Sequence, residues 1–241
     1  MPMELIHTSA PHGIDANARG FTVVAMSQGL GGVWKTRLES LSSYSIETGV
    51  AEKPVVCRHV LLRVGGSRRH VLSRISPCGL DYTGRPNRIA HHLLLDPSEC
   101  PGSGPGWLLQ QDDLFCHQWD RDPVILGVAP ILPDSNITPS VCSIWKELTG
   151  DAGHAGHVLR HLQSEDRKPL VLVLPNGNAI PPLTLFAEAI ALLDPADRWT
   201  ATFTTLVQKL PSDAECAIQI AIAGTQTART ALAHPGMLAL D

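Results

Sequence analysis

The chain has few of the features that direct a protein into a membrane or out of the cell. No basic stretch followed by an apolar one appears near its first residue, so no secretory signal is visible. The apolar run Leu170–Leu174 is far too short to span a bilayer. We therefore expect a cytoplasmic protein with no membrane partner.

Charge and cysteine are also sparse. Charged residues make up 17% of the chain and hydrophobic residues 44%, so the chain can bury a substantial core. The net charge of −4 is too small to indicate a protein that coats nucleic acid or membranes. The six cysteines are scattered and form no CxxC pair, which indicates free thiols and argues against a structural zinc site.

Catalytic motifs are missing as well. The sequence holds no Gly-x-Ser-x-Gly elbow and no HExxH, and the glycines at Gly29–Gly32 lack the ending of a phosphate-binding P-loop. No nucleophile, base and orienting group can be assembled from the sequence. We predict no catalytic residues, no metal and no cofactor, and the enzyme question stays open with a preference for a non-enzyme.

The first half of the chain favours strands. Val55–Val64 and His70–Ser76 read as the arms of a hairpin that turns at Gly65-Gly66-Ser67. The proline- and glycine-rich residues Pro101–Gly106 predict a surface loop. Three further segments have strand patterns: Glu4–Thr8, Phe21–Met26 and Ile89–Leu95.

The second half alternates helices and strands. Thr138-Pro139 and Asp151 predict the starts of two helices, and Pro181-Pro182 the start of a third. Three segments predict strands: Leu170–Leu174 buried, Trp199–Thr205 half-buried by its alternation, and Ala217–Ala223 last in the chain.

The change of pattern between the halves predicts an α+β fold. We expect an antiparallel-rich N-terminal module over residues 1–135 and a smaller α/β module over residues 136–241. The chain stops soon after its last predicted strand, so we expect it to be either a short component or a piece of a longer protein.

The most distinctive polar segment runs from Gly79 to His92. One interpretation is a binding site for a ligand or partner, formed by Asp81, Tyr82, Arg85, Asn87, Arg88 and His91. The other is a turn in which Asp81 and Asn87 bond to their own backbone. His91 and His92 are adjacent on a predicted strand and face opposite sides, so only one of them can join such a site.

The same region is locally basic. Between Arg58 and Leu95 lie seven arginines and one acid, Asp81. Arginine binds phosphate and carboxylate groups, so nucleic acid, a nucleotide or an acidic protein surface are candidate partners. The alternative is a solvated basic face, offset by the acids between Asp112 and Asp122. His154, His157 and His161 share a predicted helix edge, where two could ligate a metal, although a polar surface is the commoner outcome.

Several segments together resemble a known family. They are Glu4–Ile14, Gly20–Leu30, Val71–Ile75, Gly79–Asp96, Gly104–Leu109 and Arg198–Cys216. They resemble the N-terminal type-2 domain of the bacterial GTPase-associated protein family, followed by its middle domain. The blocks Asp81–His92 and Trp199–Thr205 are the most specific parts.

The resemblance implies a context rather than a reaction. Members of that family are encoded beside a GTPase in bacterial conflict (immunity-like, antiphage) systems. They are thought to act as adaptors, and no catalytic residue carries over to this chain. Three hypotheses follow: an adaptor that docks a GTPase or other NTPase, a nucleotide- or nucleic-acid-sensing module using Arg58–His92, and a hydrolase or metal enzyme using Asp81 with His91 or His92.

Overall fold

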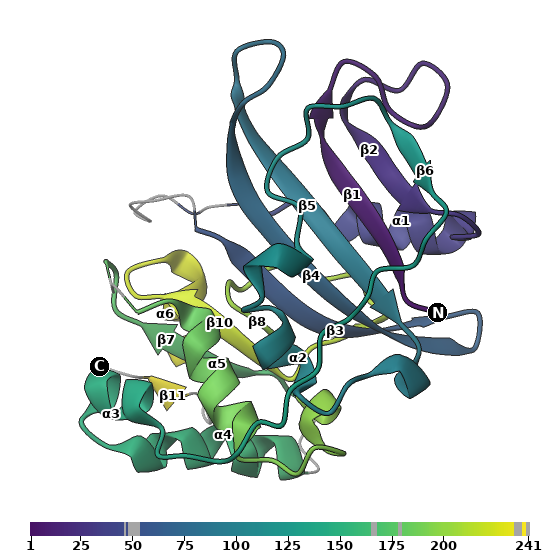
Figure 1. The fold of residues 1–241 in the computed structure, drawn as a ribbon. Coiled ribbons are helices and arrows are strands. Elements are labelled where there is room, and N and C mark those ends of the chain that lie inside the picture. Colours follow the sequence, from purple (N-terminus) through teal and green to yellow (C-terminus); the bar gives the residue numbers. More distant parts are fainter. Residues whose placement is uncertain (46, 48–53, 165–167, 178–179, 234–237, 240–241) are drawn as a thin grey trace.

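The first half of the chain forms an antiparallel sheet with one parallel edge strand. The computed structural model describes residues 1–45, 47, 54–164, 168–177, 180–233 and 238–239. The strands of this half are β1 (Met3–Ala10), β2 (Gly20–Ser27), β3 (Val56–Val64), β4 (Ser67–Leu80), β5 (Pro86–Leu95) and β6 (Val124–Leu126). They lie in the order β3-β4-β5-β1-β2-β6, with β6 parallel to β2 at the edge (Figure 1).

The predicted hairpin is confirmed. Strands β3 and β4 pair in antiparallel register from Val56 with Ile75 to Val64 with Ser67. The two-residue turn between them places Gly65 at φ 55° and Gly66 at φ 82°, values that glycine adopts without strain. Strand β4 continues well past the predicted arm, to Leu80.

The second half adds a parallel part to the same sheet. Its strands are β7 (Leu170–Leu174), β8 (Phe203–Thr204), β9 (Ala214–Glu215), β10 (Ile218–Ile222) and β11 (Leu238–Ala239). Strands β11, β7, β10 and β8 lie side by side and parallel. Strand β8 then pairs with β3, and β9 also pairs with β3, so a single sheet runs through both halves.

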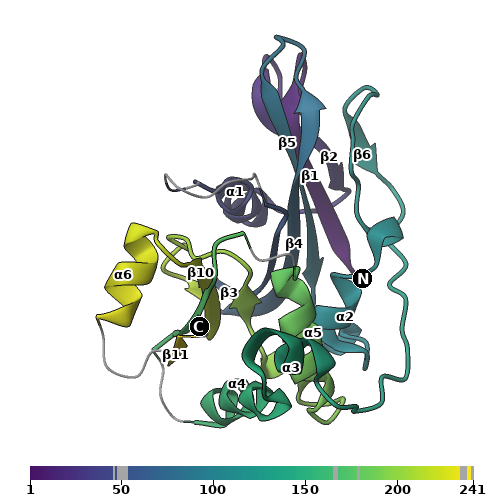
Figure 2. The ribbon, with the colours of Figure 1, turned by 90° about the vertical axis from the view of Figure 1, so that its left-hand side faces the viewer.

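Helices cover both faces of the sheet. They are α1 (Gly32–Leu41), α2 (Gly104–Leu108), α3 (Ser143–Thr149), α4 (Ala155–Gln163), α5 (Pro182–Ala191) and α6 (Gln226–Leu232). Short 3₁₀ turns are η1 (Pro97–Glu99), η2 (Asp112–Leu114), η3 (Ala152–His154) and η4 (Arg198–Thr200). Figure 2 shows α1 and α6 on one side of the sheet and α2, α3, α4 and α5 on the other. The α+β fold is thus confirmed.

The largest hydrophobic core is shared between the two halves. Leu72 and Leu93 from the antiparallel part pack in one cluster with Leu172, Phe186 and Phe203 from the parallel part. The rings of Phe186 and Phe203 lie 4.5 Å apart between centroids. Burial of this many side chains favours the joined arrangement, and the division into modules at residues 1–135 and 136–241 stays a prediction.

One segment predicted as a surface loop is a buried helix. Residues Gly104–Leu108 form α2, and Gly104, Pro105 and Gly106 are buried. Gly104 has φ 82°, and a Cβ there would lie 2.9 Å from the Cβ of Arg198. A Cβ on Gly106 would lie 3.0 Å from the Cα of Ala187 in α5. The glycines therefore allow close packing of segments, which is a use that the loop prediction overlooked.

Two other predictions need correction. The helix expected from Thr138-Pro139 begins only at Ser143, and Val141, which precedes it, is exposed. Residues 199–205 are not a half-buried strand. They form the end of η4 and the two-residue strand β8, and every residue from 201 to 205 is buried because the sheet, α5 and the cleft wall enclose them.

Some predictions of the second half hold. Leu170–Leu174 is a fully buried strand, and α5 begins at Pro182, the second proline of the pair. The Asp151 carboxylate accepts a hydrogen bond from the Gly153 amide and caps η3. After β10 the chain continues into α6 and β11, two elements that the sequence did not predict. Among the described residues, no helix combines the length and apolar character needed to cross a bilayer.

Candidate functional site

The tip of the β4–β5 hairpin is held in shape by the Asp81 carboxylate. Its Oδ1 accepts hydrogen bonds from the Thr83 amide at 2.8 Å, the Thr83 hydroxyl at 2.6 Å and the Arg85 amide at 3.0 Å. Its Oδ2 accepts one from the Ser9 hydroxyl at 2.9 Å. These bonds, led by that of the Thr83 side chain, hold the pKa of Asp81 well below its usual range.

Tyr82 and Arg85 lie exposed on this tip. Tyr82 is 52% exposed, and its neighbour Leu80 is 68% exposed. The Arg85 side chain is also exposed, while its backbone is fixed by Asp81 on one side and by a hydrogen bond from the Asp81 amide to the Arg85 carbonyl on the other. Figures 1 and 2 both show this hairpin end reaching beyond the helices, at the far end from the parallel strands.

Asn87 fastens the hairpin to β1. Its Oδ1 accepts from the amides of Ser9 and Arg88, and its Nδ2 donates to the Thr8 hydroxyl and the Ser9 carbonyl. The side chain is buried. With Asp81 it matches the turn interpretation of this segment, and it leaves Asn87 no group directed toward a ligand.

Arg88 and His91 lie on opposite faces of β5, because they are three residues apart in one strand. The Arg88 guanidinium donates to the Tyr44 carbonyl at 2.6 Å and lies 4.5 Å from the Tyr44 ring centroid. His91 Nδ1 accepts from the Cys116 amide, so Nε2 carries the proton that it donates to Glu4 at 2.8 Å. The six predicted residues therefore do not line one pocket.

The local excess of arginine is largely offset within the fold. Arg63 and Arg68 contact Glu215, Arg69 contacts Asp96, and Arg74 contacts Asp112. Arg58 is buried and donates to the carbonyls of Leu41 and Ser43 and to the Gln208 side chain. The hairpin thus does not present the seven arginines as one basic surface.

The histidines on α4 and η3 make a surface cluster. The rings of His154 and His157 lie 5.6 Å apart between centroids, and His157 accepts a hydrogen bond from Arg160. Within the described ranges, no group of three or more His, Cys, Asp or Glu side chains is arranged to hold a metal ion. His92 does not approach Asp81: its two ring nitrogens bond to the hydroxyls of Ser42 and Ser73 in the interior.

A cleft of about 1290 Å³ lies between the β3–β4 hairpin and the second half of the chain. Its first wall includes Arg68 and His70 from β4, and Glu215 from β9, the short strand that pairs with β3. Its second wall comes from α4, from η4, and from the residues that precede β7 and β10. The cleft thus opens at the amino ends of two parallel strands, and both halves of the chain contribute to it.

A pair of histidines and a tryptophan form the inner wall of the cleft. His59 Nε2 lies 3.0 Å from His70 Nδ1, and His59 Nδ1 lies 2.7 Å from the Ala201 carbonyl. The Trp199 ring meets both imidazoles edge-on, with centroids 5.2 Å from each, and donates its indole N–H to the Pro101 carbonyl. His70 and Trp199 line the cleft, whereas His59 is fully buried behind them.

Burial keeps both imidazoles neutral at physiological pH. The pKa of His59 falls to about 3, first through burial and then through the neighbouring His70. The pKa of His70 falls to about 4, first through burial and then through the nearby positive charge of Arg68. The neutral state fixes where the protons lie, because each ring then has one N–H group and one lone pair.

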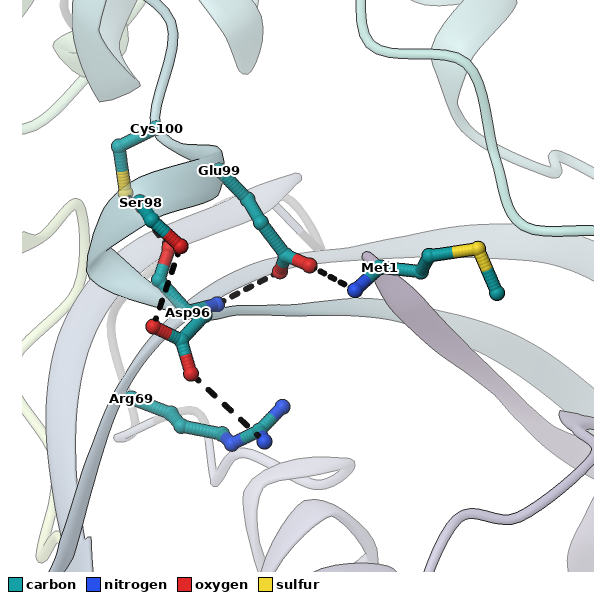
Figure 3. A network of polar contacts seen from close by, with 6 residues as sticks. All are labelled: Met1, Arg69, Asp96, Ser98, Glu99 and Cys100. Atoms are coloured by element: carbon teal, nitrogen blue, oxygen red, sulfur yellow. Dashed lines mark hydrogen bonds and ion pairs between the residues drawn. The ribbon is translucent and has the colours of Figure 1, made fainter.

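A polar network supports the rim of the cleft beside η1 (Figure 3). The Glu99 carboxylate accepts from the Asp96 amide at 2.8 Å and pairs with the N-terminal ammonium of Met1. The Asp96 carboxylate faces Arg69 at 3.8 Å, and the Cys100 thiol donates to the Asp96 carbonyl. The network fixes η1, from which Pro97 and Cys100 face the cleft.

The sequence did not predict that His59, His70 and Trp199 lie together. His59 and His70 are diagonal neighbours on adjacent strands, as the pairs His59 with Leu72 and Leu61 with His70 show. A two-residue turn at Gly65-Gly66 implies this register, so the proximity of the two histidines could have been found. The approach of Trp199 could not, because it depends on long-range packing of η4.

Comparison with known families gives two matches along the chain. Residues 1–131 match the model described as GTPase-associated protein 1, N-terminal domain type 2. Residues 145–240 match the model described as GTPase-associated protein 1, middle domain. Searches of the curated proteins and of the solved structures find no match to this chain.

Proposed function

Because the chain belongs to the GTPase-associated protein 1 family, we propose that it is a non-enzymatic adaptor that docks a GTPase or another NTPase protein. The docking surface is the tip of the β4–β5 hairpin, with Tyr82 and Arg85 as its main contacts. The setting is a bacterial conflict system, in which the adaptor connects the NTPase to other components of an antiphage response.

The observation that carries this proposal is the combination of exposure and rigidity at the tip. Leu80, Tyr82 and Arg85 are exposed, yet the Asp81 carboxylate accepts hydrogen bonds from the backbone amides of Thr83 and Arg85 and from the Thr83 hydroxyl. Tyrosine and arginine dominate binding energy at protein interfaces. A surface that is ordered before binding loses less conformational entropy when the partner arrives.

The experiment is a quantitative co-purification from the native host. The tagged wild-type chain is compared with the double variant Tyr82→Ala/Arg85→Glu, and recovered NTPase proteins are measured by mass spectrometry. We expect the double variant to recover at least about tenfold less NTPase than the wild type, since loss of a hot-spot residue at an interface costs about 2 kcal/mol or more.

Lys146→Glu serves as the matched control. Lys146 is exposed on α3, far from the hairpin tip, so the charge reversal should leave recovery unchanged. Equal recovery of an NTPase by wild type and the double variant would move the docking surface elsewhere. Absence of any NTPase from the wild-type sample would contradict the adaptor proposal itself.

A further inference from the structure

The proton positions in the histidine pair leave one acceptor open to the cleft. The Ala201 carbonyl can only accept, so His59 Nδ1 carries the proton of that ring. His59 Nε2 is then a lone pair, and His70 Nδ1 must donate to it. His70 Nε2 is therefore also a lone pair, and no described residue hydrogen bonds to it.

This acceptor is held rigidly in the cleft wall. His70 is only 8% exposed and lines the cleft, with its Nδ1 edge turned back toward His59. Trp199 is also 8% exposed and packs against the same ring. The lone pair of His70 Nε2 is open to the cleft and can accept only from water or from a ligand, so the position favours a ligand with an N–H or O–H group.

The charge of the cleft selects for an anion. Arg68 lines the cleft near His70, and it shares the carboxylate of Glu215 with a second arginine, Arg63. Glu215 pairs more closely with Arg63, and Arg68 lies 3.6 Å from its second carboxylate oxygen, so the Arg68 guanidinium keeps positive charge to offer a ligand. Arginine suits phosphate oxygens in particular because it can bond two of them at once.

We propose that the cleft binds a mononucleotide, whose base donates an N–H group to His70 Nε2 beside Trp199 and whose phosphate faces Arg68. A mononucleotide supplies what the three features of the cleft require: a hydrogen-bond donor for His70 Nε2, a flat ring for the aromatic wall, and negative charge for Arg68. The volume of about 1290 Å³ exceeds that of a typical small-molecule pocket and leaves room for water around the nucleotide. This site shares no residue with the hairpin tip and does not depend on it.

The test is isothermal titration calorimetry of the intact chain at low salt, where phosphate contacts are strongest. The probes are AMP, GMP, ATP and GTP, with inorganic phosphate, adenosine and guanosine as fragments and a short single-stranded oligonucleotide as the alternative ligand. We expect at least one mononucleotide to bind the wild-type chain about tenfold tighter than inorganic phosphate or its own nucleoside.

Two substitutions at position 70 separate folding from recognition. His70→Asn keeps a donor near Nδ1 for His59 but removes the acceptor at Nε2. His70→Gln places an amide near Nε2 but loses the bond to His59. We expect His70→Asn to weaken nucleotide binding about tenfold and His70→Gln to weaken it less, the loss of one good hydrogen bond being worth about tenfold.

Arg68→Ala tests the phosphate contact, with Arg19→Ala as the matched control. Both arginines are exposed, and Arg19 lies on the loop between β1 and β2, outside the cleft. We expect Arg68→Ala to weaken mononucleotides about tenfold and Arg19→Ala to leave them unchanged. The proposal is overturned if no mononucleotide binds, if only the oligonucleotide binds, or if His70→Asn and Arg68→Ala bind as tightly as wild type.

Discussion

Arg198 provides the strongest stability prediction. Its guanidinium is 2% exposed and donates to four backbone carbonyls. The bonds to Gly102 and Ile137 are 2.8 Å long, while those to Leu193 and Ala191 are 3.2 and 3.3 Å. One side chain thereby ties together the segment before α2, the segment before α3 and the end of α5. The substitution Arg198→Met fills similar space and removes all four donors.

The two short bonds set the magnitude of the expected loss. Hydrogen bonds from a charged donor contribute about 1.5–3 kcal/mol each, and the longer pair contributes less. The desolvation cost of the buried guanidinium offsets part of the sum, so we expect the free energy of unfolding to fall by about 3–4 kcal/mol. That is a large share of the roughly 5–15 kcal/mol that holds a domain folded.

Urea unfolding, followed by circular dichroism and tryptophan fluorescence, measures the loss. With a slope of about 3 kcal/mol per molar, the midpoint should fall by about 1 M. Arg198→Lys should lose nearly as much, because an ammonium presents its donors at one point and cannot reach four carbonyls. The exposed Arg19→Met should stay within about 0.5 kcal/mol of wild type. A midpoint for Arg198→Met within about 0.3 M of wild type would refute the reasoning.

Two further predictions concern side chains whose pKa is lowered in the folded state. Unfolded histidine binds a proton near pH 6.5, but folded His59 and His70 do so only near pH 3 and 4. Stability should therefore fall as pH drops from about 6.5 toward 4, and His70→Asn should flatten this dependence in urea midpoints at several pH values; equal slopes would contradict it. The depressed pKa of Asp81 stabilises the tip above the unfolded pKa, and this contribution is lost as pH falls through the lower folded value. Asp81→Asn should therefore speed amide exchange of Thr83 and Arg85 by NMR at neutral pH, and unchanged exchange would show that other contacts hold the turn.

The local sequence pattern predicted correctly those elements whose conformation depends mainly on their own residues. The β3–β4 hairpin follows from two glycines between strand-forming segments, and Leu170–Leu174 is apolar on both faces because helices cover both sides of β7. The start of α5 follows from a proline pair, since proline suits the first turn of a helix.

The predictions that were wrong share a different cause. The buried helix α2 contains Gly104 and Gly106 because Arg198 and Ala187 approach them closely, and both contacts come from distant parts of the chain. The alternation Trp199–Thr205 indicates a half-buried strand only if one face meets solvent, but β3, α5 and the cleft wall enclose this segment. Burial by residues from distant parts of the chain cannot be read from the hydrophobic periodicity of the buried segment itself.

The hairpin tip and the cleft lie at opposite ends of strand β4. Strand β4 carries His70 near its start and Leu80 at its end, ten residues later. At about 3.3 Å per residue, roughly 33 Å separate the two positions. A nucleotide in the cleft therefore does not reach the hairpin tip, and we expect substitutions at one position to leave the other intact. The adaptor and nucleotide proposals thus stand or fall separately, although both β4 and β5 run between the tip and the cleft, where Pro97 and Cys100 follow β5.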